Sequence, residues 1–385
     1  MVSNRGSSRH VERRSPVVHC IAHSAKTTAA MATVDKPYIQ TPLIRSPHLS
    51  KLLGCNVLLK LELLQPSGSF KSRGVGNLVY ETYLASLSTS AATTISQRPT
   101  IFCSSAGNAG CAAAEASQRY GCPCVVVVPT STGAHIVSRL RDEYDAHVVM
   151  HGNVWKQADD EARRLLAEHI QSGGTGKYCP PFDDPLIWRG NSTLVDEVLA
   201  QLREQSGSSS NDLASLNWAG IVCAVGGGGL YAGIIEGLQR HFDNSGTPGP
   251  AVIASETVGA SKLYQSLQHR KRVVLPKIST IASSLGADAV AETAFELARS
   301  YNRTIPFAVT DAQAVSACLS LLDQYRLLVE PACGAALAVC YYEEHISMLK
   351  RELELKSDDT IVIVVCGGST VTLESLQKYK EQFCS

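Results

Sequence analysis

One lysine of this sequence lies in a setting suited to carbonyl chemistry. Lys71 follows a strand-like apolar run and has small, hydroxylated and glycine neighbours, in the segment Pro66-Ser67-Gly68-Ser69-Phe70-Lys71-Ser72-Arg73. Burial lowers the pKa of an ammonium group, so a lysine held in a pocket there can lose its proton and attack a carbonyl carbon. An isolated lysine is more often a solvated residue of a helix. The chemical interpretation therefore depends on what the rest of the chain places beside Lys71.

Two glycine-rich segments supply groups that bind anions. Residues 103–110, Cys-Ser-Ser-Ala-Gly-Asn-Ala-Gly, join a strand-like run to an alanine-rich helix and aim N–H groups and hydroxyls at one point. Residues 226–229 are four consecutive glycines, which allow the backbone to close around a phosphate. A Walker loop is excluded because no Gly-Lys-Ser/Thr follows, and the G-x-G-x-x-G spacing is broken at Tyr231. A tight turn is the alternative explanation for either cluster.

With the phrase Val364-Val365-Cys366-Gly367-Gly368-Ser369, these segments resemble the pyridoxal-phosphate (PLP) enzymes of the tryptophan-synthase-β-like fold. Within that group the chain is similar to the catabolic L-serine/L-threonine dehydratases. The similarity runs from about Thr41 to the C-terminus and includes residues 180–188, Pro-Pro-Phe-Asp-Asp-Pro-Leu-Ile-Trp, and residues 329–336, Val-Glu-Pro-Ala-Cys-Gly-Ala-Ala. Separated motifs in the same order make chance agreement improbable.

The resemblance implies an α/β fold. It has two domains, each with a mostly parallel twisted sheet flanked by helices, and PLP in the cleft between them. Residues 35–68 and 183–385 would form the large PLP-binding domain, residues 69–182 the small inserted domain, and residues 1–34 a disordered or targeting tail. The alternation of strand-like and helix-like runs agrees with this class. Residues 84–100 and 206–216 are expected to be polar surface loops.

The resemblance also implies the reaction and the residues of the site. L-Serine would be dehydrated and deaminated to pyruvate and ammonia, and L-threonine to 2-oxobutyrate and ammonia, in amino-acid catabolism that feeds gluconeogenesis. Lys71 would hold PLP as a Schiff base and then remove the Cα proton as a general base. Phe70 would lie against the cofactor ring and Cys366 would face its nitrogen. The remaining cofactor-binding residues would be Asn108, Gly226, Gly227, Gly228 and Gly229, and the substrate carboxylate would be bound by Ser105, Ala106, Gly107, Asn108 and Ala109.

A monovalent cation is a further implication of the resemblance. The similar enzymes hold potassium largely through backbone carbonyls beside the cofactor phosphate. The matching positions here are Glu256, Ala260, Leu285 and Ala287. Carbonyl ligands leave almost no trace in a sequence, and a glutamate that ends a strand is otherwise usually solvated.

Composition limits the other classes of function. The chain has 385 residues, of which 44% are hydrophobic, enough for a large core and about two domains. Lys and Arg together number 35, as do Asp and Glu, so neither a nucleic-acid surface nor a polybasic membrane patch is indicated. No apolar stretch approaches 18 residues, which excludes a membrane span. The 13 scattered cysteines favour a reducing compartment.

The cytoplasm is the expected location and a homodimer the expected assembly. Residues 1–30 are rich in Arg, Ser and Ala, which is also typical of a mitochondrial or other organellar targeting peptide. Met31 is an alternative start.

Other members of the same fold are alternatives to a dehydratase. Cysteine-synthase types usually have Lys-Asp-Arg where this chain has Lys71-Ser72-Arg73, and biosynthetic threonine dehydratases add a regulatory domain where only residues 367–385 follow Cys366. Serine racemase has Ser before the Gly-Asn pair and His after it, where this chain has Ala106 and Ala109. A protein that binds PLP without catalysis is the alternative from a different class, and ammonia release from serine would separate the two.

Overall fold

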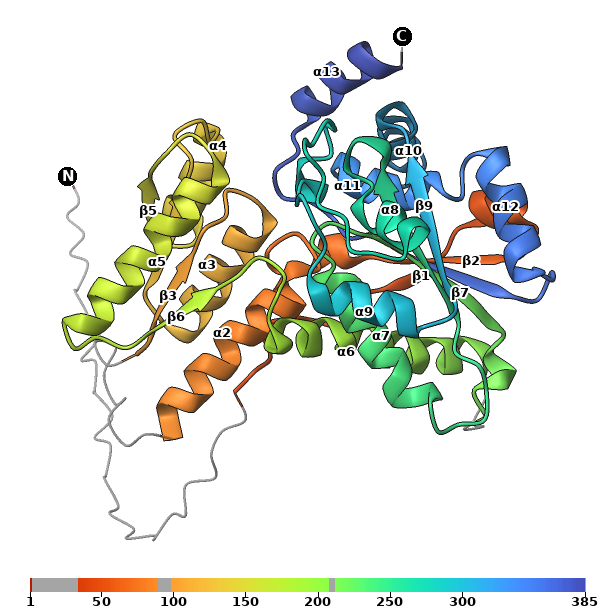
Figure 1. The fold of residues 1–385 in the computed structure, drawn as a ribbon, viewed down its shortest axis with the longest axis horizontal. Helices are drawn as coiled ribbons and strands as arrows, with labels where there is room; N and C mark the ends of the chain where they lie inside the picture. The colour runs from red at the N-terminus through yellow and green to blue at the C-terminus, as the bar shows by residue number, and fades with distance from the viewer. Residues whose placement is uncertain (2–33, 89–97, 208–211, 385) are drawn as a thin grey trace, which may run out of the picture. The chain divides into compact units, whose positions relative to one another are not determined.

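The computed structural model describes residue 1 and residues 34–88, 98–207 and 212–384. Lys36–Ser385 form one compact unit (Figure 1). The predicted tail and targeting segment therefore lie almost entirely outside the described residues.

The larger sheet has six strands in the order β1-β2-β10-β7-β8-β9. All neighbouring pairs are parallel except β1 and β2. In the register of the central strand, Val362 of β10 pairs with Leu58 of β2 and with Ile221 of β7. The strands are β1 (Leu43–Arg45), β2 (Asn56–Lys60), β7 (Trp218–Ala224), β8 (Ala251–Thr257), β9 (Thr304–Val309) and β10 (Thr360–Val364).

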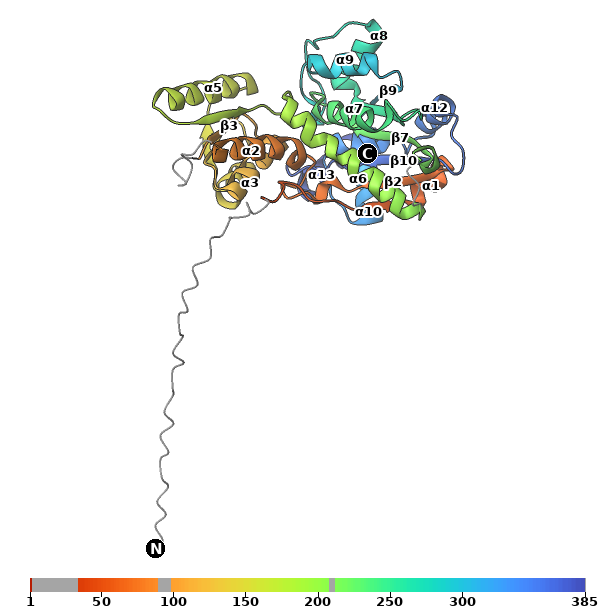
Figure 2. The same ribbon diagram turned by 90° about the horizontal axis from the view of Figure 1, so that it is seen from below.

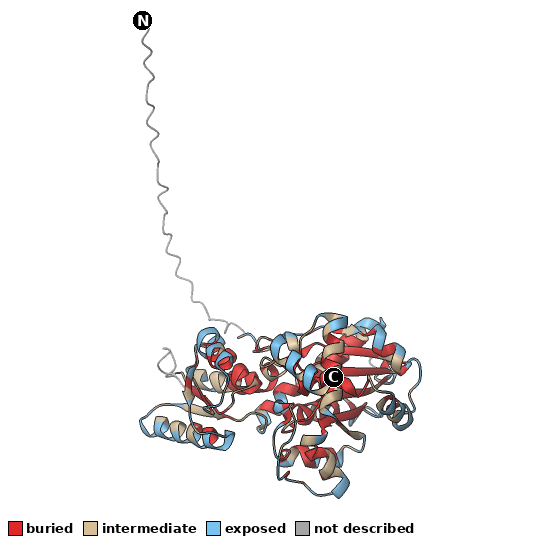
Figure 3. Cartoon of the chain, turned by 90° about the horizontal axis from the view of Figure 1, so that it is seen from above, coloured by how far each residue is buried: buried red, intermediate tan, exposed pale blue. Residues whose placement is uncertain are grey.

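The residues of β7, β8 and β10 are almost all buried, as expected for parallel strands covered on both faces (Figure 3). Helices α7, α11 and α8 contact strands of this sheet. The helices that belong to this part of the chain are α1 (Pro47–Leu53), α6 (Pro185–Ser206), α7 (Gly229–Phe242), α8 (Lys262–His269), α9 (Glu292–Ser300), α10 (Asp311–Tyr325), α11 (Pro331–Ala338), α12 (Glu343–Leu353) and α13 (Leu373–Phe383).

The smaller sheet has four parallel strands in the order β5-β4-β3-β6. Figure 2 shows α5 on one side of β3, with α2 and α3 on the other. The strands are β3 (Thr100–Cys103), β4 (Cys124–Val128), β5 (His147–Met150) and β6 (Gly176–Cys179), and the helices are α2 (Lys71–Ser88), α3 (Asn108–Tyr120), α4 (Ala134–Ser138) and α5 (Trp155–Gln171).

The α/β class with mostly parallel sheets flanked by helices is thus confirmed. The strands of the smaller sheet all fall within residues 69–182 and those of the larger sheet outside them; the domain boundaries themselves remain a prediction. Residues 84–88 of the expected loop at residues 84–100 belong instead to α2, which continues to Ser88, and residues 89–97 lie outside the described residues. Ala85 and Leu87 favour helix, and no glycine or proline ends the helix earlier.

The fold brings the predicted site segments to the carboxyl ends of strands. Asn108 begins α3 after β3, the glycine run begins α7 after β7, and Cys366 follows β10. The phrase at residues 180–188 has a local structural role as well, since the side chain of Asp184 accepts a hydrogen bond from Leu186 N and Pro185 occupies the first turn of α6. No helix in the described part of the chain is long and apolar enough to cross a membrane.

Candidate active site

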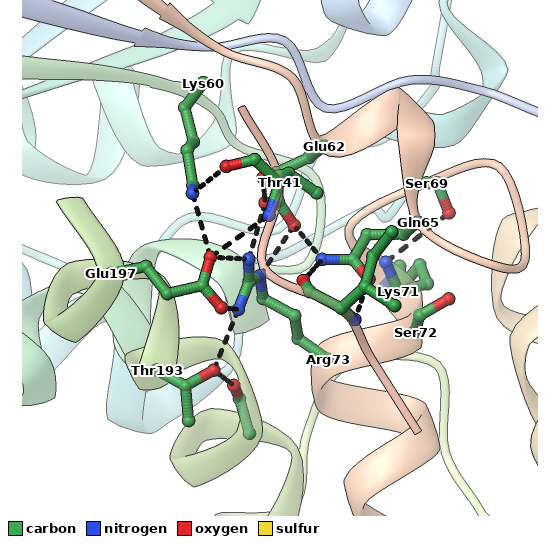
Figure 4. Close-up of polar contacts among 12 residues, drawn as sticks. Thr41, Lys60, Glu62, Gln65, Ser69, Lys71, Ser72, Arg73, Thr193 and Glu197 are labelled. Carbon is green, nitrogen blue, oxygen red and sulfur yellow. Dashed lines mark hydrogen bonds and ion pairs between the residues drawn. The ribbon is translucent and has the colours of Figure 1, made fainter. Parts of the chain in front are cut away.

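Lys71 is the first residue of α2, and its side chain is directed toward the end of the smaller sheet. Its Nζ donates a hydrogen bond to the carbonyl oxygen of Pro181, just beyond β6, and lies 5.2 Å from the centre of the Phe70 ring. The backbone N–H of Lys71 contacts Ser69 Oγ at 3.4 Å (Figure 4). Burial lowers the pKa of Lys71 to about 8. The neutral amine that a nucleophile or general base requires is therefore more abundant near neutral pH than it is for an ordinary lysine.

The backbone on either side of Lys71 is bonded to the segment that carries Cys366. Phe70 N donates to the carbonyl oxygen of Cys366 at 3.1 Å, and Gly368 N donates to the carbonyl oxygen of Gly68 at 3.1 Å. A Cβ on Gly367, whose φ is +95°, would lie 2.5 Å from the Gly68 oxygen, so this close approach requires glycine. The structure thus brings Phe70, Lys71 and Cys366 together from opposite ends of the sequence.

Cys366 is buried and carries a neutral thiol. The adjacent thiol of Cys333 and burial raise the pKa of Cys366 well above its ordinary value. If the cofactor's ring nitrogen faced Cys366, as the resemblance implies, a neutral thiol would offer no negative charge with which to hold a proton there.

Asn108 joins three segments through its side-chain amide. Its Nδ2 donates to Glu330 Oε1 at 2.9 Å, while its Oδ1 accepts from both the backbone N and the Oγ of Ser369, each at 2.8 Å. Because both ends of the amide are bonded, the orientation of Asn108 is fixed. The same Nδ2 atom also donates to Ser284 Oγ at 3.4 Å. This contact is weaker, and a better acceptor could replace it.

Glu330 is a site residue that the sequence analysis missed. It is 6% exposed, and its second carboxylate oxygen accepts from Thr370 Oγ1 at 3.1 Å. Burial raises the pKa of Glu330, and the hydrogen bonds from Ser284, Asn108 and Thr370 oppose that shift. Its signal was a glutamate within the apolar phrase at residues 329–336, since a buried carboxylate needs polar partners from elsewhere.

The predicted carboxylate-binding loop spans the connection between β3 and α3 and the first two residues of α3, Asn108 and Ala109. Ser105, Ala106 and Gly107 are half-buried, whereas Asn108 and Ala109 are buried. Ser105 Oγ accepts from Gly107 N at 3.2 Å, which shapes the turn. The loop presents its backbone at the N-terminus of a 13-residue helix, where the helix dipole favours a negative ligand.

The run from Gly226 to Gly229 forms the N-terminus of α7. Each glycine approaches a neighbour so closely that a Cβ would clash: 2.7 Å from Ser284 O at Gly226, 2.4 Å from the Phe182 ring at Gly227, 2.5 Å from Ala294 at Gly228 and 2.6 Å from Phe182 O at Gly229. Gly228 also has a φ of +93°. These glycines are therefore required by packing, and they leave backbone N–H groups at a helix N-terminus that suits a phosphate.

A cavity of about 240 Å³ lies beside the residues that are hydrogen-bonded to Asn108 and Glu330. Ser284, Glu330 and Thr370 line it, whereas Lys71 and the glycine run do not. His135, Ser375 and Tyr379 supply further polar groups to its wall.

A buried ion cluster, defined here as Lys60, Glu62, Arg73 and Glu197, fixes the start of α2 (Figure 4). Arg73 forms two-pronged contacts with Glu62, at 2.7 and 2.8 Å, and with Glu197, at 2.8 and 2.7 Å. Lys60 Nζ contacts Glu197 at 2.8 Å. Since Arg73 is two residues from Lys71, the cluster positions the helix that carries the reactive amine.

The predicted cation ligands converge on a lysine. Glu256 Oε1 and the carbonyl oxygens of Ala260 and Leu285 lie 3.2, 3.0 and 2.9 Å from Lys262 Nζ. Within the part of the chain that the structure describes, this ammonium makes no hydrogen bond to Ala287, the fourth predicted ligand. Nor do the described residues contain a group of three or more His, Cys, Asp or Glu that could hold a metal ion.

The chain belongs to the family of pyridoxal-phosphate-dependent enzymes, whose family model matches residues 34–367. It is 39% identical over 342 residues to an L-serine dehydratase of Saccharomyces cerevisiae, which covers 89% of this chain and 96% of that protein. It is also 39% identical over 344 residues to the catabolic L-serine/threonine dehydratase of S. cerevisiae, covering 89% and 90%. Among solved structures, a fungal L-serine ammonia-lyase from Rhizomucor miehei superposes with a TM-score of 0.76 at 34% identity, covering 91% of this chain and all of that one.

The residues present fit PLP, which carries an aldehyde and a phosphate. Lys71 supplies an amine with a lowered pKa, and the glycine run supplies a helix N-terminus without side chains, at the start of α7, of the kind that binds phosphate. The cofactor assignment made from the resemblance is therefore confirmed at the level of the family.

The pKa of Lys71 predicts how cofactor-free protein takes up PLP. The rate of covalent binding should rise with pH and level off above about pH 8, because the neutral amine is the reactive form and its fraction saturates above a pKa of about 8. Stopped-flow absorbance after mixing with PLP between pH 6 and 10 measures this rate. A free lysine analogue, with the ordinary pKa of 10.5, should still accelerate up to pH 10 in the same buffers. A protein rate that also keeps rising to pH 10 would contradict the lowered pKa.

Proposed function

We propose that this protein is a PLP-dependent L-serine/L-threonine ammonia-lyase. It converts L-serine to pyruvate and ammonia, and L-threonine to 2-oxobutyrate and ammonia. The observation that carries the proposal is that backbone hydrogen bonds join the segment of Lys71 to the segment of Cys366. They bring an amine of lowered pKa close to a neutral thiol. The names of the relatives at 39% identity support the same substrates.

PLP, when bound, supplies a ring that withdraws electrons from the substrate Cα. The Lys71 amine takes the proton from Cα as the general base, and its lowered pKa keeps it competent near neutral pH. The loop of residues 105–109 binds the substrate carboxylate through its N–H groups. Asn108, oriented by Glu330 and Ser369, would donate to the cofactor's ring oxygen, and the run from Gly226 to Gly229 would hold the phosphate.

The reaction breaks the Cα–H and Cβ–O bonds, and the hydroxyl leaves as water. Water is then taken up as the nitrogen leaves as ammonia, so serine yields pyruvate and ammonia without net oxidation. A neutral thiol at Cys366 would favour this outcome, because a thiol that faced the cofactor's ring nitrogen would not keep that nitrogen protonated, and the ring would then withdraw electrons less strongly.

A steady-state assay of L-serine, L-threonine and D-serine tests the proposal. L-Serine should give pyruvate and L-threonine should give 2-oxobutyrate, each with one equivalent of ammonia. D-Serine should give little product. Two substrates that differ by one methyl group are separated by only about 1 to 3 kcal/mol of pocket contacts, so both should be turned over. PLP binding without ammonia release would instead support a non-catalytic protein.

Serine racemase is the second candidate, and Ala106 separates the two. Racemisation needs an acid on the face opposite Lys71 to return a proton to the carbanion, and the methyl group of Ala106 has none. The solved racemase from maize is 22% identical to this chain, a likeness of fold alone.

Ala106→Ser should therefore raise D-serine formation from L-serine, with a lower rate of pyruvate formation because the carboxylate loop becomes crowded. Chiral chromatography after incubation with L-serine measures it. Ala109→Ser is the matched control, since it adds the same hydroxyl to a buried position of the same loop and should form no D-serine. Substantial D-serine from the unmutated enzyme would favour the racemase instead.

We also propose a homodimer and a cytoplasmic location, both of which rest on the resemblance. Light scattering of the full chain tests the first, and the localisation of a C-terminally tagged chain with and without residues 1–30 tests the second.

A further inference from the structure

Lys262, a fully buried lysine outside the ion cluster described above, lies among oxygen atoms that come from three segments of the chain. It begins α8, and its side chain is fully buried. The nearest oxygens are the carbonyls of Leu285 at 2.9 Å, Ala260 at 3.0 Å and Val225 at 3.3 Å, and Glu256 Oε1 at 3.2 Å. An ammonium group has three N–H donors and no acceptor, so this all-acceptor environment matches a cation.

The geometry of the site matches a charged ammonium and carboxylate pair. Glu256 is fixed in place, because its two oxygens also accept from Leu263 N at 3.1 Å and Tyr264 N at 2.8 Å. Three of the four oxygens around Nζ are carbonyls, which cannot donate a proton. The charged pair is therefore the form that satisfies every group in this site.

Lys262 occupies the point where potassium was expected. Glu256, Ala260 and Leu285, three of the four predicted ligands, already contact its Nζ. A potassium ion bound to the same oxygens would have to lie at the position of that nitrogen, with the same charge. The residues present therefore do not fit a separate monovalent cation.

We propose that the ammonium group of Lys262 is a built-in replacement for a monovalent cation, which makes the enzyme independent of potassium. Lys262 acts as a positioning residue, because two of the carbonyl groups to which it donates are adjacent in sequence to segments that would bind the cofactor. Val225 directly precedes Gly226, and Leu285 directly follows Ser284. Ser284 in turn packs on Gly226, with its carbonyl oxygen 2.7 Å from where a Cβ would be, and contacts Asn108. The ammonium thus holds the glycine run against the segment that supports Asn108.

Two substitutions of Lys262 distinguish a cation site from a simple core contact. Lys262→Ser removes the ammonium and leaves a cavity lined by carbonyl oxygens, whereas Lys262→Met fills the volume and supplies no charge. The full-length, PLP-loaded proteins are compared in KCl and in choline chloride at equal ionic strength, because choline is too large for the cavity. Thermal unfolding and L-serine turnover are both measured.

We expect the native protein to unfold at the same temperature in both salts. Lys262→Ser should unfold several degrees lower in choline chloride and recover in KCl, while Lys262→Met should be destabilised equally in both. Turnover by Lys262→Ser should fall about 10- to 100-fold in choline chloride through displacement of the glycine run, and return with potassium. Lys378→Ala, which removes a lysine that is 69% exposed, is the surface control and should not respond to the choice of salt.

Specific stabilisation or activation of the native protein by potassium would overturn the proposal, whatever the variants do. So would a Lys262→Ser protein that folds but responds identically to the two salts. The turnover measurement rests on the proposed function, but the unfolding measurement does not. A native protein inactive on L-serine with the expected unfolding pattern would refute the function and leave the role of Lys262 supported.

Discussion

Lys71→Ala is expected to lower the turnover of L-serine by at least about 10³-fold and to abolish the visible absorbance of covalently bound PLP. The effect is this large because one amine is proposed to hold the cofactor and to take the Cα proton. Its environment is specific: burial lowers its pKa to about 8, and its Nζ is held by the carbonyl of Pro181. Steady-state pyruvate formation and the absorbance spectrum of the purified protein measure the two effects separately.

Two further substitutions control this experiment. Lys71→Arg keeps the positive charge but cannot lose its proton, so it should be as inactive and as colourless as the alanine variant. Lys378→Ala should keep both the colour and the activity, since this lysine is exposed and forms an ion pair only within α13. Undiminished colour in Lys71→Ala, bound covalently to another lysine, would refute the assignment.

The segments of the site could be predicted because the residues that characterise each segment are consecutive in the sequence. The lysine phrase, the loop at residues 103–110 and the glycine run each combine a strand-like run, small residues and a helix start. The apolar strands of the larger sheet were equally evident, because strands buried on both faces are continuously apolar. Neither the site segments nor these strands need an alternating pattern of apolar and polar side chains to be recognised.

Contacts between distant residues could not be predicted in the same way. Glu330 meets Asn108 across 222 positions, and nothing adjacent in the chain indicates the pair. The position of Lys262 among these oxygens could not be predicted for a different reason. Its partners are mainly backbone carbonyls, which every residue has, so the sequence predicted the ring of oxygens only through the resemblance and did not reveal the lysine that fills it.

Arg73 carries the second large expectation, which concerns stability. Arg73→Met should reduce the free energy of unfolding by about 3 to 5 kcal/mol, because removing one partner of a buried ion pair leaves an uncompensated charge. Both side chains of the Arg73–Glu62 pair are fully buried, and Glu197 loses its two-pronged partner as well, which leaves Lys60 as the remaining cation of the buried ion cluster, beside two carboxylates. A loss of this size is a large fraction of the about 5 to 15 kcal/mol that stabilises a typical protein.

Urea unfolding of the cofactor-free proteins, followed by circular dichroism, isolates this effect, since bound PLP would add its own stabilisation. Arg299→Met is the matched control: it makes the same change in a pair whose side chains are 55% and 53% exposed, and it should cost no more than about 1 kcal/mol. Arg73→Lys should fall between the two, because lysine restores the charge but not the planar fork that contacts Glu62 and Glu197 together. If Arg73→Met unfolds at the same urea concentration as Arg299→Met, the buried ion cluster does not fix the start of α2, and the position of Lys71 must depend on its backbone bonds to the Cys366 segment alone.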